Sequence, residues 1–306
     1  MMKRLSISWL VGAVVLFTSV GAFELALASS SHSNAQAQAQ AQELSDQEEK
    51  VSYSGIAVPY DQKERMIGKA YWKSDTKKLA YVEEHTFFYL GQQRVKVETV
   101  YKWPTGEKFA DFVSDYTKHP YIPAYRFRDR RYGRVEGLEW LDSGKVRVYG
   151  RKYHDHEMKS AEIDPPAPGF AGQGLNFFIV DNFLKLSSRN EPLEVGFVVP
   201  IAQKSYGFRI KTRGEPDGKV VKFRAEIDNW FIRLFAPSID VLYDAEKKVL
   251  LEYRGPSNLL NNNKDIKPVV IKYDTSELSI QQASRPYQLQ RRDASISSGE
   301  AQRENP

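Results

Sequence analysis

The scarcity of helical sequence constrains this chain most, because only one stretch beyond the first 28 residues is a good helix candidate. Residues 60–75 are ambiguous, because their helical spacing is interrupted by Gly68. After a segment rich in proline and glycine (165–174), apolar residues recur every three or four positions from Leu175 to Leu186. This spacing predicts a helix with one apolar face. Asp181 and Asn182 form helices poorly, so the helix needs tertiary packing to persist. A short helix with three phenylalanines must bury them, and the remaining sequence offers a β-sheet as the partner.

The remainder of the chain has the alternation of antiparallel strands joined by tight turns. The clearest strand is Arg94–Lys102, which pairs with Leu79–Tyr89 across Gly91. Its alternation predicts one face with Val95, Val97, Thr99 and Tyr101, and another with Arg94, Lys96, Glu98 and Val100. About a dozen such strands follow one another, and large antiparallel sheets curl or close. We therefore expect an all-β fold in which a large curved antiparallel sheet forms an open or half barrel around a central helix.

Residues 1–28 have the pattern of a signal peptide. Lys3 and Arg4 are basic, an apolar run follows, and Ala26–Ala28 fits an A-x-A cleavage site. A retained membrane anchor is the alternative, because the apolar run is just long enough to span a bilayer. Export through a cleaved signal peptide predicts a periplasmic protein.

Both flanks of the expected domain are polar. Residues 29–50 contain an alternating Ala-Gln tract, and residues 281–306 are polar with mixed charge. Such segments bury too little apolar surface to fold, so we expect a disordered linker and a disordered tail. Residues 51–280 are then expected to form a single β-rich domain.

The chain contains no cysteine and is mildly basic, with a formal charge of +5. Without cysteine it cannot use a cysteine nucleophile, bind zinc through thiolates or carry a lipid on an N-terminal cysteine. An exported chain without disulfides fits a large core in a bacterial periplasm.

The last third of the sequence resembles an uncharacterised family of exported, β-rich bacterial proteins. The matching residues are Asn229-Trp230, Arg233-Leu234, Ala236-Pro237, Tyr243-Asp244, Leu250-Leu251, Tyr253, Gly255 and Ser257-Asn258, with Val180–Phe183 and Val198–Pro200 as a middle motif and Glu84-His85 near the beginning. The resemblance implies a periplasmic β-rich domain without an assigned activity. The chain departs from the family after Phe183, where an acidic helix extension is shortened. A more distant likeness, in architecture alone, is to periplasmic half-barrel carriers of lipids and lipoproteins.

Three polar clusters are candidates for chemistry. His154 and His156 would point to one side of a strand and could share a metal with a remote carboxylate, or they could lie in a solvated turn. Within Glu83-Glu84-His85, His85 lies on an apolar face and is expected to be an inward, hydrogen-bonded histidine. The arginines at 126, 128, 130, 131 and 134 alternate with aromatic residues, which predicts a solvated face or contacts with anionic headgroups or glycans.

No nucleophile elbow, phosphate loop or paired-carboxylate motif is present, so we expect a protein that is not an enzyme and has no cofactor. The predicted function is a periplasmic binding or carrier protein for an apolar, lipid-like ligand held between helix and sheet. The candidate ligand-binding residues are Phe178, Phe183, Trp230 and Phe235, the last two from a densely apolar run. Alternatives are a structural or envelope-interaction domain with a self-filled core, and a metal-assisted hydrolase using His154 and His156. Expected partners are a lipid, an envelope protein or, transiently, a membrane, and not nucleic acid.

Overall fold

The computed structural model describes residues 58–188, 191–214, 218–234, 236–276 and 278. The predicted signal peptide, linker and tail lie outside these residues, and so does Phe235. Within the described residues, no helix is both long and apolar enough to cross a bilayer.

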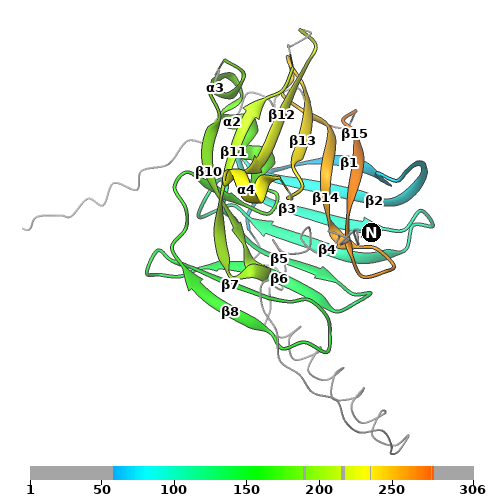
Figure 1. Cartoon of the computed structure of the whole chain (residues 1–306), viewed down its shortest axis with the longest axis vertical. Helices are drawn as coiled ribbons and strands as arrows, with labels where there is room; N and C mark the ends of the chain where they lie inside the picture. Colours follow the sequence, from blue (N-terminus) through cyan, green and yellow to red (C-terminus); the bar gives the residue numbers. More distant parts are fainter. Residues whose placement is uncertain (1–57, 189–190, 215–217, 235, 277, 279–306) are drawn as a thin grey trace, which may run out of the picture.

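Within the described residues, one sheet of fifteen strands makes up most of the structure, which confirms the predicted all-β fold (Figure 1). Neighbouring strands pair in the order β8-β7-β6-β5-β4-β3-β2-β1-β15-β14-β13-β12-β11-β10-β9, and every pair is antiparallel except β9 with β10. The strands are β1 Gln62–Trp72, β2 Asp75–Leu90, β3 Gln93–Lys102, β4 Lys108–Asp115, β5 Ala124–Asp129, β6 Arg134–Trp140, β7 Val146–Arg151, β8 Lys159–Ile163, β9 Gly169–Ala171, β10 Leu193–Val199, β11 Lys204–Thr212, β12 Val220–Ile227, β13 Ile239–Asp244, β14 Leu250–Leu260 and β15 Ile266–Asp274.

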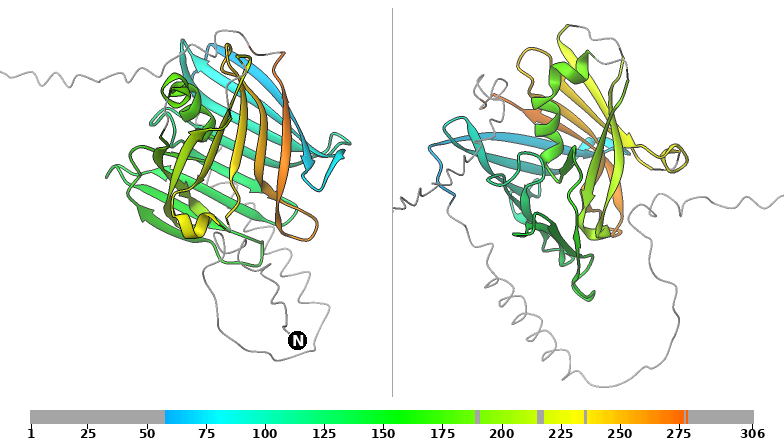
Figure 2. Two further views of the ribbon diagram at one scale, coloured as in Figure 1. Left: turned by 45° about the horizontal axis from the view of Figure 1, so that its top comes forward. Right: turned by 90° about the vertical axis from the view of Figure 1, so that its left-hand side faces the viewer.

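The sheet curves so strongly that its two halves face each other as walls of an open barrel (Figure 2). The two edge strands, β8 and β9, do not pair with each other, but segments next to them form contacts between the two walls. The 3-10 turn η1 (Pro200–Ala202) lies against β6 and β7, with Ile201 over Gly150. The backbone N–H of Ala171 also donates to the carbonyl of Tyr121 at 2.9 Å.

The predicted helix is present and lies between the two walls at one end of the barrel (Figure 2, right). It is divided into α2 (Gly174–Asp181) and α3 (Phe183–Ser187). The break falls at Asn182, whose side-chain amide donates to the carbonyl of Phe178 at 2.9 Å. A polar side chain that bonds to the preceding turn competes with regular helix geometry, which accounts for the bend.

The apolar face of the two helices fills the space between the walls. Leu175, Phe178, Ile179, Phe183 and Leu186 are all buried, as predicted. They join a core cluster with β10 to β14, and a second cluster fills the half formed by β1 to β8. The concave side of the sheet is therefore largely occupied by the protein's own side chains.

Candidate functional site

A cleft with a volume of about 50 Å³ opens at the helix end of the barrel, between α2, the β2–β3 turn and the β13–β14 turn. Phe87, Phe177 and Val180 contribute to its apolar wall, together with Met66 and Leu250. Its polar lining consists of Gln92, Gln93, Arg94, Asn176, Asp181 and Lys248. The lining therefore combines apolar side chains with hydrogen-bonding groups, as small-ligand sites do, in a cleft much smaller than most of them.

A β-bulge directs Arg94 into this cleft. The register between β2 and β3 shifts where Phe88 faces Lys96 and Tyr89 faces Arg94, so Val95 has no opposite residue. Val95 packs instead with Phe88 and Val58 on the other side of the sheet. The predicted alternation thus holds for Val97, Thr99 and Tyr101, which are buried, but is reversed at Arg94 and Val95. A bulge re-aims one side chain in this way.

The Arg94 guanidinium is stacked between aromatic rings. Its carbon lies 3.2 Å from the ring centre of Phe177 and 4.8 Å from that of Tyr116. Nη2 donates to the carbonyl of Pro120 at 3.2 Å, while the buried Nε has no hydrogen-bond partner. Among the described residues, no carboxylate lies within 4.0 Å of Arg94. Burial lowers the pKa of Arg94, but guanidinium groups are so basic that the side chain stays charged.

Asp181 provides the nearest negative charge in the cleft. Burial raises the pKa of its carboxyl group, and the charge of Arg94 and a hydrogen bond from Tyr121 act in the opposite direction without cancelling it. Arg94 and Asp181 therefore influence each other through space but do not form a contact ion pair. Among the described residues, the carbonyl of Pro120 accepts from the Arg94 guanidinium, whose terminal amino groups carry further N–H donors for a group that enters the cleft.

A hydrogen-bonded network of polar side chains lies in the interior between the two walls. His85 bonds through Nδ1 to Thr99 Oγ1 at 2.8 Å and through Nε2 to Glu83 Oε2 at 3.2 Å. Gln173, just before α2, donates to the same Thr99 oxygen at 2.6 Å. His85 is thus the inward, hydrogen-bonded histidine that the sequence predicted. These groups satisfy one another's hydrogen bonds in the interior, as buried polar groups usually do.

The predicted ligand-binding residues within the described ranges are not all brought together. Phe178 and Phe183 are each 3 % exposed within the core, and the helix phenylalanine that lines the cleft is Phe177. Their predicted role in ligand binding stays a prediction. Trp230 is 68 % exposed on α4 (Trp230–Arg233), away from the concave floor where we expected it, and Phe235 lies outside the described residues.

The histidine pair and the clustered arginines, the other two predicted clusters, lie outside the cleft. His154 and His156 are exposed in the turn between β7 and β8, not on a strand. Within the described ranges, no group of three His, Asp or Glu side chains is placed to hold a metal ion. Several of the clustered arginines pair with carboxylates of the fold, such as Arg131 with the fully buried Asp129 at 2.6 Å.

Comparisons with known proteins give little further guidance. No protein-family model matches the chain, and no curated protein matches it significantly. A crystal structure of a β-barrel-like protein of a domain of unknown function, DUF1849, from Brucella abortus is similar at 6% identity and a TM-score of 0.42. The match covers 69% of this chain and 95% of the other. The resemblance to a family of exported proteins stays a prediction, although its β-rich character is confirmed by the fold.

Proposed function

We propose that this chain is a non-enzymatic binding protein that holds a small amphipathic anion in the cleft beside Arg94. The observation that supports this proposal is the charged guanidinium of Arg94 in the lining of the cleft, stacked on Phe177. A guanidinium donates charge-assisted hydrogen bonds to anions, so its terminal amino groups would attract a negatively charged group into the cleft.

The chemistry of the lining defines the ligand class. Guanidinium groups bind carboxylates and phosphates through paired hydrogen bonds, so the head group is expected to be one of these. Phe87, Phe177 and Val180 would contact an apolar body. The small volume of about 50 Å³ admits the head group and a few carbon atoms, while the rest of the ligand would lie outside the cleft.

The apolar body of the ligand, which was expected from the sequence, would then lie at the helix end of the barrel and not in its filled interior. We further propose that the protein is exported to the periplasm and uses no cofactor. The pattern of residues 1–28 supports export.

Titration with octanoate, followed by amide chemical shifts in NMR spectra, tests the proposal. We expect shifts at Phe177, Val180 and Arg94, and none with 1-octanol, which has the same apolar body without the charge. Arg94→Met is expected to weaken octanoate binding about 10- to 100-fold, since a hydrogen bond to a charged group contributes about 1.5–3 kcal/mol. Arg147→Met, on the exposed side of β7, is the matched control. Equal binding of octanoate by both variants would refute the proposal.

A second candidate is a structural or envelope-interaction domain that holds no small molecule. The two core clusters favour it, because their side chains occupy much of the space between the walls in the described part of the chain. In that case octanoate would cause no shifts at the cleft, and purified protein would carry no small molecule.

A further inference from the structure

A group of exposed large apolar side chains lies on and directly after α4, between β12 and β13. Trp230, Phe231, Ile232 and Leu234 are 68, 56, 39 and 67 % exposed. Asn229 caps the helix, because its Oδ1 accepts from the backbone N–H groups of Phe231 and Ile232 at 3.0 and 3.1 Å. These apolar side chains are therefore held on an ordered turn at the surface.

The fourth residue of α4 ties this turn to the outer face of β12. Arg233 Nη1 donates to the carbonyls of Ile227 and Asp228 at 3.2 and 2.9 Å, and its Nε lies 3.9 Å from Glu226 Oε1. Glu226 belongs to the face opposite the buried Phe223 and Ala225, since side chains alternate along a strand. The apolar turn therefore lies at the outer side of the barrel wall.

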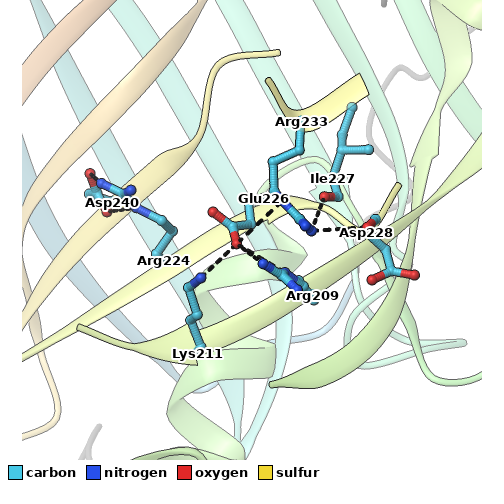
Figure 3. A network of polar contacts seen from close by, with 8 residues as sticks. All are labelled: Arg209, Lys211, Arg224, Glu226, Ile227, Asp228, Arg233 and Asp240. Atoms are coloured by element: carbon cyan, nitrogen blue, oxygen red, sulfur yellow. Dashed lines mark hydrogen bonds and ion pairs between the residues drawn. The ribbon is translucent and has the colours of Figure 1, made fainter. Parts of the chain in front are cut away.

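A network of basic and acidic side chains lies beside α4 (Figure 3). Arg209 and Lys211 both bind Glu226 Oε1, at 2.7 and 2.8 Å, and Arg224 forms a two-point pair with Asp240. The basic side chains of this network are 23–28 % exposed, whereas Glu226 is 9 % exposed. The carboxylate thus lies beneath the cations that surround it.

The charges of this surface do not balance. Five basic residues (Arg209, Lys211, Lys222, Arg224 and Arg233) lie with four acidic ones (Glu194, Glu226, Asp228 and Asp240), which leaves a net charge of +1. Figure 3 shows the Asp228 carboxylate pointing away from Glu226. An apolar ridge next to a surface with more basic than acidic side chains resembles the arrangement of proteins that lie on anionic membranes.

We propose that α4 and the basic network beside it bind the surface of an anionic lipid bilayer. Trp230, Phe231 and Leu234 would enter the interface between head groups and acyl chains, where tryptophan is favoured. The basic network would attract anionic head groups. The ridge protrudes and is capped at its base, so it can enter a fluid interface without a preformed groove in a partner.

Flotation with lipid vesicles tests the proposal on protein purified from its own cells. We expect binding to vesicles of phosphatidylcholine with phosphatidylglycerol, at least 10-fold weaker binding to phosphatidylcholine alone, and release by high salt. The double variant Trp230→Ala/Phe231→Ala should bind the anionic vesicles at least 10-fold more weakly than the wild type. The control is Leu90→Ala/Leu184→Ala, which removes exposed leucines from the helix end of the barrel.

A fluorescence measurement separates insertion from any change in folding. Anionic vesicles should shift the tryptophan emission of the wild type to shorter wavelength, and Trp230→Phe, which keeps an aromatic ring, should lose most of that shift while still binding. Equal binding to neutral and anionic vesicles, or equal loss in the leucine control, would overturn the proposal. So would capture of a protein through this ridge without any binding to vesicles.

Discussion

Truncation of Phe183 to alanine tests whether the space between the walls is filled or forms a ligand chamber. Phe183 is 3 % exposed, and its ring meets the rings of Phe223 and Tyr243 edge to face at 5.3 and 5.9 Å. Both of these partners are fully buried. The change therefore removes a ring from the middle of a packed aromatic group and leaves a cavity.

The structure gives the expected size of the effect. Replacing a fully packed phenylalanine by alanine costs about 3–5 kcal/mol, which includes the lost contacts and the cavity. For a domain of roughly 150–250 residues, each kcal/mol lowers Tm by about 2–4 °C, so Tm should fall by roughly 6–20 °C. If Phe183 instead lined an open chamber, most of its ring would already lack packing partners and the loss would be much smaller.

Urea unfolding monitored by circular dichroism provides the assay. Leu184→Ala is the matched control, because Leu184 is the next residue and is 71 % exposed. Its free energy of unfolding should stay within about 0.5 kcal/mol of the wild type. A loss below about 1 kcal/mol for Phe183→Ala would refute the conclusion that the interior is self-filled.

Four further variants or titrations follow from single contacts. Burial raises the pKa of Asp181 above its ordinary 3.8, so Asp181→Asn should increase the free energy of unfolding at pH 7, and the increase should vanish below about pH 3.8 in urea titrations. Burial alone would raise the pKa of Glu226, but hydrogen bonds from Lys211 and Arg209 lower it overall. Glu226→Gln should therefore cost about 1–3 kcal/mol at pH 7, and this cost should disappear as the pH falls through the lowered pKa. Gly174→Ala should destabilise α2, measured by thermal melting, because the new Cβ would lie 1.9 Å from the Tyr121 carbonyl oxygen. Burial raises the pKa of Tyr101 far above 10, so its phenol should ionise only when alkali unfolds the protein, seen as coincident changes in tyrosine absorbance and circular dichroism.

The sequence predicted the fold class and the buried face of the helix because periodic spacing records burial directly. Leu175, Phe178 and Leu186 recur with the helical period and are buried in the structure. The bend at Asn182 was not predicted, since it depends on one side-chain hydrogen bond to the preceding turn. Spacing gives the face of a helix but not its local geometry.

The cleft could not be predicted, because its main residue is placed by an irregularity. Strict alternation assigns Arg94 to the outer face, and only the bulge beside Tyr89 turns it inward. Asp181 carried a weak signal, as a carboxyl group within an apolar helix. Trp230 illustrates the opposite error: its apolar neighbours suggested burial, but the Asn229 cap begins a helical turn that exposes them.

Native mass spectrometry of the protein purified from its own cells tests the central claim most directly. We expect the mass of the protein to be increased by that of one small anion, identified after extraction as a carboxylate or phosphate with an apolar body. That mass should be absent from Arg94→Met and retained by Arg147→Met. A protein of bare mass that gains nothing when octanoate is added would contradict the account and leave the interaction domain as the better description.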